Sequence, residues 1–94
     1  MSKTVTVHLS GHLKAFSGGE MEVSLPGEFA TVSDALDALW RKHGALHDRV
    51  LNEQGEIRQH VNIFADGQDV KRMGGLATRL KEGEIHIFNA VSGG

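Results

Sequence analysis

The sequence predicts a small α+β domain in which a mixed sheet of four to five strands carries one main helix on one face. Four short segments alternate polar and apolar residues, a pattern typical of strands buried on one side only. A fifth segment, between the second and third of these strands, repeats its apolar residues with the period of a helix. A length of 94 residues leaves room for one domain with one hydrophobic core.

The first two strands are predicted to pair as a hairpin. Residues 4–9 alternate strictly, and residues 21–25 repeat the pattern with Met21, Val23 and Leu25 as the apolar positions. The loop between the two strands ends in Ser17-Gly18-Gly19. Glycine adopts the positive φ angles that such a connection requires, so the two strands can fold back on each other.

The main helix is predicted between Thr31 and Gly44. Thr31 and Asp34 form a pattern like a capping box, with Asp in place of the usual Glu. The apolar residues that follow lie on one stripe of the helix: Val32, Ala35, Leu36, Leu39 and Trp40. We expect Gly44 to end the helix in a left-handed conformation.

The second half of the chain contains shorter elements. We expect a short helical turn at residues 47–51, a strand at residues 61–65 and a short return strand at residues 68–71. Asp66-Gly67 is a strong turn signal between these two strands. The compact segment after them should direct Leu76 and Leu80 inward.

The last strand contains Ile85 and Ile87. A helix that connects a hairpin to a further strand of the same sheet must cover one face of that sheet. The element order is therefore that of a β-grasp fold. We divide the chain into a β-grasp domain over residues 1–89 and a flexible C-terminal tail over residues 90–94.

Composition excludes several classes of function. A net charge of −2 gives no electrostatic reason to bind nucleic acid, and no apolar run approaches the length of a membrane span. We therefore expect a cytoplasmic protein with neither partner. The absence of cysteine excludes a disulfide, a thiolate metal site and a cysteine nucleophile.

The tail, Ala90-Val91-Ser92-Gly93-Gly94, is the most unusual segment. Five extended residues reach about 17 Å, and two terminal glycines let the backbone alone pass through a narrow channel. The terminal carboxylate is ionised at neutral pH and can attack a phosphoryl group of ATP to give an acyl-adenylate. An inert end is the alternative, since two terminal glycines arise by chance in about 1 protein in 200.

The chain resembles the MoaD/ThiS family of ubiquitin-like sulfur carriers, and most of all its CysO-type members, which supply a cysteine synthase. The resemblance covers nearly the whole chain. It is sharpest at residues 61–69, 75–78, 81–84 and 90–94. It implies that Gly94 is adenylated, then converted to a thiocarboxylate that donates sulfur in the biosynthesis of cysteine or another metabolite. The protein would be a carrier without enzymatic activity of its own.

The resemblance also implies the partners. One is an adenylating and sulfur-transferring enzyme like those that activate ubiquitin; it uses Mg-ATP, and no cofactor is expected on this chain. The other is a sulfur-accepting biosynthetic enzyme, either cysteine synthase-like or the large subunit of a molybdopterin synthase. Gly93 should permit close approach, while Val91 and Ser92 make extended-backbone contacts in the partner's channel.

Phe64 and Phe88 are candidate partner-binding residues. If Ile63 and Ile87 face the helix, strand alternation places both aromatic rings on the opposite, water-facing side of the sheet. The alternative is that residues 45–58 fold over the rings, or that a bulge reverses the phase of a strand. The residues alone leave both interpretations open.

Six histidines raise the question of a metal site. His43 and His47 have the spacing of two ligands on one helical face, but Gly44 should separate them. His8 and His86 occupy outward strand positions, where no ligand group is expected to converge with them. We therefore predict no metal site.

Three other functions remain open. The chain could be a ubiquitin-like modifier joined through Gly94 to lysine side chains of target proteins. It could also be the small subunit of a molybdopterin synthase, or a β-grasp interaction module with an inert tail. Covalent conjugates would favour the modifier, and a stable complex with a larger chain would favour the synthase subunit.

Overall fold

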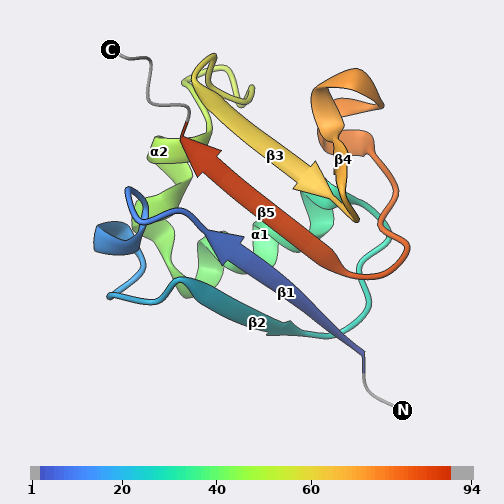
Figure 1. Ribbon diagram of the computed structural model, residues 1–94, viewed down its shortest axis with the longest axis horizontal. Helices are drawn as coiled ribbons and strands as arrows, with labels where there is room; N and C mark the ends of the chain where they lie inside the picture. Colours follow the sequence, from blue (N-terminus) through green and yellow to red (C-terminus); the bar gives the residue numbers. More distant parts are fainter. Residues whose placement is uncertain (1–2, 90–94) are drawn as a thin grey trace.

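The computed structural model describes residues 3–89 of the chain. Within this range the strands form one five-stranded sheet in the order β2-β1-β5-β3-β4 (Figure 1). Its strands are β1 (Thr4–Leu9), β2 (Glu22–Pro26), β3 (Val61–Ala65), β4 (Gln68–Asp69) and β5 (Glu84–Asn89). The sheet is mixed, because β5 runs parallel to β1 and antiparallel to β3. The predicted α+β architecture is confirmed.

The hairpin of β1 and β2 forms as predicted. Val7 lies opposite Val23 in an antiparallel ladder, and both side chains are buried. Gly18 and Gly19 have φ angles of 68° and 91°, the positive values that the loop was expected to need. The prediction that Met21 is the first apolar position of the second strand was wrong, because β2 begins one residue later and Met21 is 50% exposed.

The main helix α1 spans Val32–Lys42. The Thr31 side chain accepts a hydrogen bond from the backbone N–H of Asp34 at 3.2 Å, so the predicted cap is present. The prediction that Gly44 ends the helix in a left-handed conformation was wrong, because Gly44 instead begins a 3₁₀ helix (Gly44–Leu46). This turn leads directly into the short helix α2 (His47–Val50) and buries Leu46 in the core.

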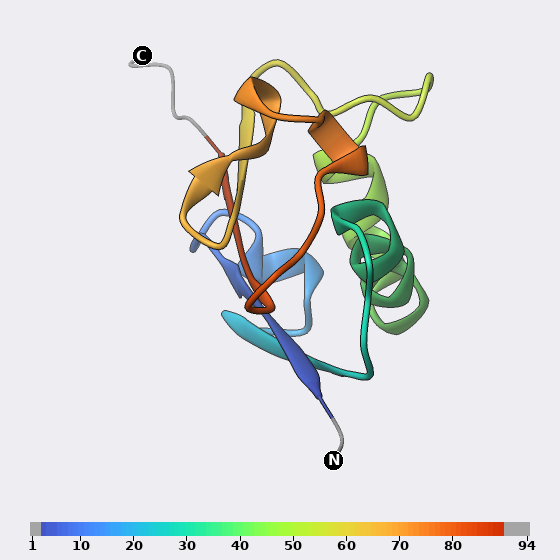
Figure 2. The ribbon, with the colours of Figure 1, turned by 90° about the vertical axis from the view of Figure 1, so that its right-hand side faces the viewer.

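The core lies between the sheet and α1, which covers one face of the sheet (Figure 2). Each strand of the hairpin, as well as β3 and β5, directs every second side chain toward the helix. The helix contributes four buried side chains: Val32, Ala35, Leu36 and Leu39. None of the helices in the described range is long and apolar enough to cross a membrane.

The segment between β3 and β5 is less regular than expected. The return strand β4 has only two residues, because the chain then turns into a 3₁₀ helix (Val70–Arg72) that buries Val70. A second 3₁₀ helix follows at Gly75–Ala77. Leu76 and Leu80 pack against the core, as expected. The backbone of Leu80 donates a hydrogen bond to Ala30, which ties this segment to the start of α1.

Candidate functional site: the open face of the sheet

The predicted reacting residue Gly94 and the predicted tail contacts Val91, Ser92 and Gly93 lie outside the described residues. The described chain ends at Asn89, the last residue of β5. Strand β5 occupies the middle of the sheet, where hydrogen bonds from β1 and β3 hold it on both sides. The backbone N–H of Ser10 donates to the carbonyl of Ile87 at 3.1 Å, so this anchoring extends almost to Asn89. The tail therefore starts from a fixed point of the domain.

Phe64 and Phe88 both lie on the face of the sheet turned away from α1. Phe64 stands between the buried Ile63 and Ala65, and Phe88 follows the buried Ile87. Phe88 is 40% exposed, and the two rings meet edge to face with centroids 5.7 Å apart. The segment 45–58 does not fold over the two rings, because it packs Leu46 and Val50 into the core on the opposite side of the sheet. Their part in partner binding stays a prediction.

A row of side chains crosses this face from strand to strand. In the register of the sheet, Glu22 on β2 lies beside His8 on β1, His8 beside His86 on β5, and His86 beside Phe64 on β3. The rings of His8 and His86 stack with centroids 4.3 Å apart and an angle of 12° between their planes. We call this surface, formed by Glu22, His8, Glu84, His86, Phe64 and Phe88, the open face.

The expectation that no ligand group converges with the strand histidines was wrong. Nitrogen atoms of His8 and His86 and a carboxylate oxygen of Glu84 all lie within 4.8 Å of one another. The missing information was the register between β1 and β5, which brings together two residues 78 positions apart in the chain. By contrast, His43 and His47 each face a separate acidic residue, Glu20 and Asp48 respectively.

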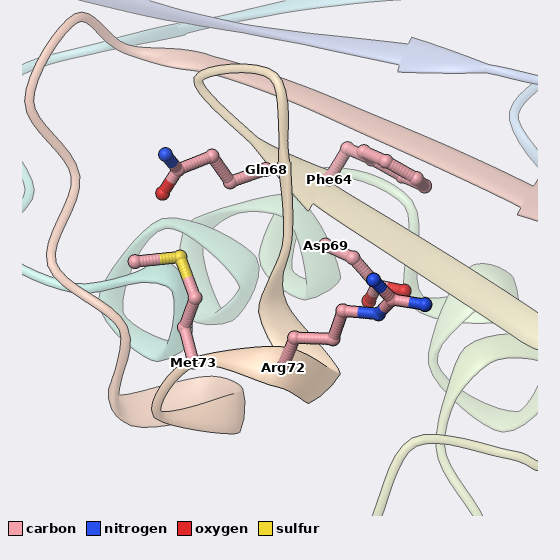
Figure 3. A pocket seen from close by; sticks show the side chains of 5 residues that line it. All are labelled: Phe64, Gln68, Asp69, Arg72 and Met73. Carbon is pink, nitrogen blue, oxygen red and sulfur yellow. The ribbon is translucent and has the colours of Figure 1, made fainter.

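A groove of about 610 Å³ adjoins the open face at its β4 edge (Figure 3). It is lined by Phe64, Gln68, Asp69, Arg72 and Met73. Met73 is 51% exposed, so the groove offers an exposed apolar side chain in addition to Phe64, together with one acidic and one basic side chain. The exposure of Met73 could not be predicted from the sequence, because the irregular backbone after β4 has no periodicity.

Asp66 fixes the turn between β3 and β4 to the start of β5. Its carboxylate accepts hydrogen bonds from the backbone N–H groups of Lys81 at 2.7 Å and Glu84 at 3.1 Å. Partial desolvation raises the pKa of this carboxyl group, but the N–H donors around it outweigh that effect, and the pKa is lowered overall. The role of Asp66 is structural: it holds Glu84 and the following residues of β5 in place.

Comparisons with known proteins agree on the family and include both a sulfur carrier and a protein modifier. The sequence model of the ThiS family matches residues 7–94. A sulfur carrier protein CysO of Mycobacterium tuberculosis is 31% identical over 93 residues, which cover 96% of this chain and 98% of that protein. Small archaeal modifier protein 3 of Haloferax volcanii is 38% identical over 66 residues, 69% of this chain and 71% of that protein.

Among solved structures, the crystal structure of the Amycolatopsis orientalis BexX/CysO complex contains a similar chain. It superposes with a TM-score of 0.83 at 31% identity and covers 96% of this chain and 99% of that one. The likeness therefore extends over both the sequence and the fold.

Proposed function

The chain belongs to the ThiS family, and from this premise we propose that it is a sulfur carrier whose Gly94 carboxylate is converted to a thiocarboxylate. The observation that carries the proposal is the match to CysO sulfur carriers over 96% of the chain, together with the terminal Gly93-Gly94. The chain supplies a folded domain that its partners bind and the Gly94 carboxylate that reacts, and a partner enzyme supplies the catalysis.

The chemistry runs in two steps. An oxygen of the Gly94 carboxylate attacks the α-phosphorus of ATP, the bond between the α-phosphorus and the bridging oxygen breaks, and pyrophosphate leaves. A sulfur nucleophile of the partner then attacks the activated carbonyl carbon, and AMP leaves with one of the original carboxylate oxygens. When that nucleophile is sulfide, loss of a proton leaves the thiocarboxylate directly. When it is a persulfide, a thiol attacks the donor sulfur of the acyl disulfide, the S–S bond breaks, a new disulfide forms on the donor and the thiocarboxylate is released. Because the carboxylate is ionised at neutral pH, the first step needs no base from this chain.

The open face is the proposed docking surface for the activating enzyme. Exposed aromatic side chains at the centre of a surface bind partners well, because they bury a large area at little entropic cost. Phe88 stands one residue before Asn89, the last residue of β5 before the tail, so an enzyme that binds Phe88 also receives the tail. The relative in the BexX/CysO complex was solved together with another protein, which supports a second partner for this chain. We propose that this second partner is the enzyme that accepts the sulfur.

A second candidate function is protein modification. The observation that favours it is the likeness to small archaeal modifier protein 3 of Haloferax volcanii, which is 38% identical to this chain over 66 residues. A modifier uses the same adenylate, but a lysine amine of a target protein attacks the carbonyl in place of sulfur. The two functions therefore differ only after activation.

Intact-mass measurement tests the proposal. The full chain is incubated with an activating enzyme of its host, Mg-ATP and a sulfide source, and a carrier gains the mass of one oxygen replaced by sulfur. A chain that lacks Gly94 should fold normally but gain no mass. A chain extended by one alanine after Gly94 should also gain no mass, because its terminal carboxylate no longer belongs to glycine. Conjugates that survive a reducing, denaturing gel would favour the modifier. Failure of the full chain to react would contradict both functions.

A further inference from the structure

Two histidines and a carboxylate on the open face meet only because of the register of the parallel strands. His8 lies directly beside His86 in the ladder between β1 and β5, and Glu84 lies two residues before His86 on the same face of β5. Neighbouring strands are about 4.8 Å apart, so side chains in such a row can share one small ligand. All three residues belong to regular strands, which fixes their relative positions.

The distances fit a single small cation. Zinc binds imidazole nitrogen and carboxylate oxygen at about 2.0–2.2 Å, so two ligands of one tetrahedral ion lie about 3.4 Å apart. Nε2 of His8 is 3.4 Å from Oε2 of Glu84. The rings of His8 and His86 stack with an angle of 12° between their planes, and ligand atoms of all three residues lie within 4.8 Å of one another. Binding of one ion requires a ring to rotate so that both nitrogen lone pairs point at it.

A second carboxylate is placed to orient His8. Oε2 of Glu22 lies 3.7 Å from Nδ1 of His8, on the opposite side of the ring from Glu84. In metal sites the ligating histidine commonly turns its other ring nitrogen toward a carboxylate, which fixes the tautomer and strengthens the ligand. Glu22 is therefore placed to orient His8 through Nδ1 when Nε2 binds a metal ion.

Nε2 of His8 itself lacks a satisfying partner. The atom is buried from solvent and has no hydrogen-bond partner among residues 3–89, since Glu84 faces it at ion-pair distance without hydrogen-bond geometry. A buried polar atom left unpaired costs free energy, and ligation of a cation would remove that cost.

We propose that His8, Glu84 and His86 form a binding site for one divalent transition-metal ion of the zinc class, with Glu22 orienting His8. Two imidazoles and one carboxylate favour zinc over magnesium or calcium, which prefer all-oxygen sites. Three protein ligands leave a fourth position for water or for a group of a bound partner. This site does not involve the tail, but it lies on the open face, so a bound ion would be part of the proposed docking surface.

Isothermal titration of Zn²⁺ into the full chain at neutral pH tests the site. We expect saturable binding of one ion per chain. His8→Gln and His86→Gln should each weaken it at least tenfold, because even changes to residues that only orient ligands cost about 10–100-fold. Glu22→Gln should weaken it by about tenfold. His47→Gln is the matched control, since His47 pairs with Asp48 at 2.9 Å outside the site, and should leave the affinity unchanged.

Ring nitrogen NMR spectra of the wild-type chain give a readout that does not depend on the variants. Addition of Zn²⁺ should shift Nε2 of His8 and a nitrogen of His86 while the other histidines stay unchanged. Lack of saturable binding, equal weakening by His47→Gln, or shifts confined to histidines other than His8 and His86 would each overturn the proposal.

Discussion

The two faces of the sheet are built from the same strands but differ in side-chain type and in burial. The face against α1 carries aliphatic side chains such as Val7, Ile63 and Ile87, all fully buried. One residue further along each strand, the open face carries His8, Phe64 and Phe88, which keep contact with solvent. Strand alternation thus separates the residues that hold the fold from residues free to bind partners.

Neighbouring positions on β5 give the sharpest test of this separation. Ile87→Ala removes a fully buried side chain and should lower the free energy of unfolding by about 2–5 kcal/mol. Phe88→Ala, one residue away on the open face, should change it by only about 0.5 kcal/mol. Urea unfolding of both variants measures the difference. Equal losses would show that the open face is packed as tightly as the core.

The helix-covered face also depends on the cap of α1. Thr31→Ala removes the side-chain acceptor for the N–H of Asp34 and should cost about 1 kcal/mol. Ser33→Ala, inside the first turn of α1, is the matched control and should be nearly neutral. Thermal unfolding compares the two, and an effect of Ser33→Ala as large as that of Thr31→Ala would argue against the cap.

Asp66 connects the turn between β3 and β4 to the start of β5, and its contribution to stability should depend on pH. Because its pKa is lower in the folded chain than the ordinary value of 3.8, it stabilises the fold above that pH. The stabilisation is lost as the pH falls below 3.8 through the folded pKa. Asp66→Asn should cost about 1 kcal/mol at neutral pH and flatten this part of the pH profile. Chemical unfolding of the wild-type chain and of Asp66→Asn between neutral and strongly acidic pH provides the measurement. If both proteins had the same dependence of stability on pH, the hydrogen bonds assigned to Asp66 would be excluded.

On the open face the expected effect is on partner binding, with little change in stability. Phe88→Ala should raise the KM of the activating enzyme for this chain about fivefold, as loss of a central aromatic contact does. Met21→Ala is the matched control, because Met21 is similarly exposed but lies outside the open face. Steady-state kinetics of pyrophosphate release distinguishes them. If the two variants behaved alike, the open face would not be the docking surface.

Local patterns in the sequence predicted the elements whose causes are local. The capping pattern at Thr31 and the apolar stripe of α1 depend on residues within a few positions of one another, and both are present. Gly44 was misjudged because its conformation depends on the burial of Leu46, a tertiary effect. The convergence of His8 and His86 needs the register of two strands from opposite ends of the chain, which no local pattern contains.

The prediction for the tail, in contrast, does not depend on the fold. The prediction for Gly94 rests on the chemistry of a terminal carboxylate and on family resemblance, and the described residues contribute only the fixed point at the end of β5 from which the tail starts.

Peptide mapping after the activation reaction shows which residue gains sulfur. Trypsin cleaves after Lys81 and releases residues 82–94 as one peptide that contains the C-terminus. With the terminal sulfur alkylated before digestion, the account predicts that this peptide alone carries the exchange of oxygen for sulfur, located by fragmentation at Gly94. Sulfur found on any other peptide, or at another position within this one, would contradict it.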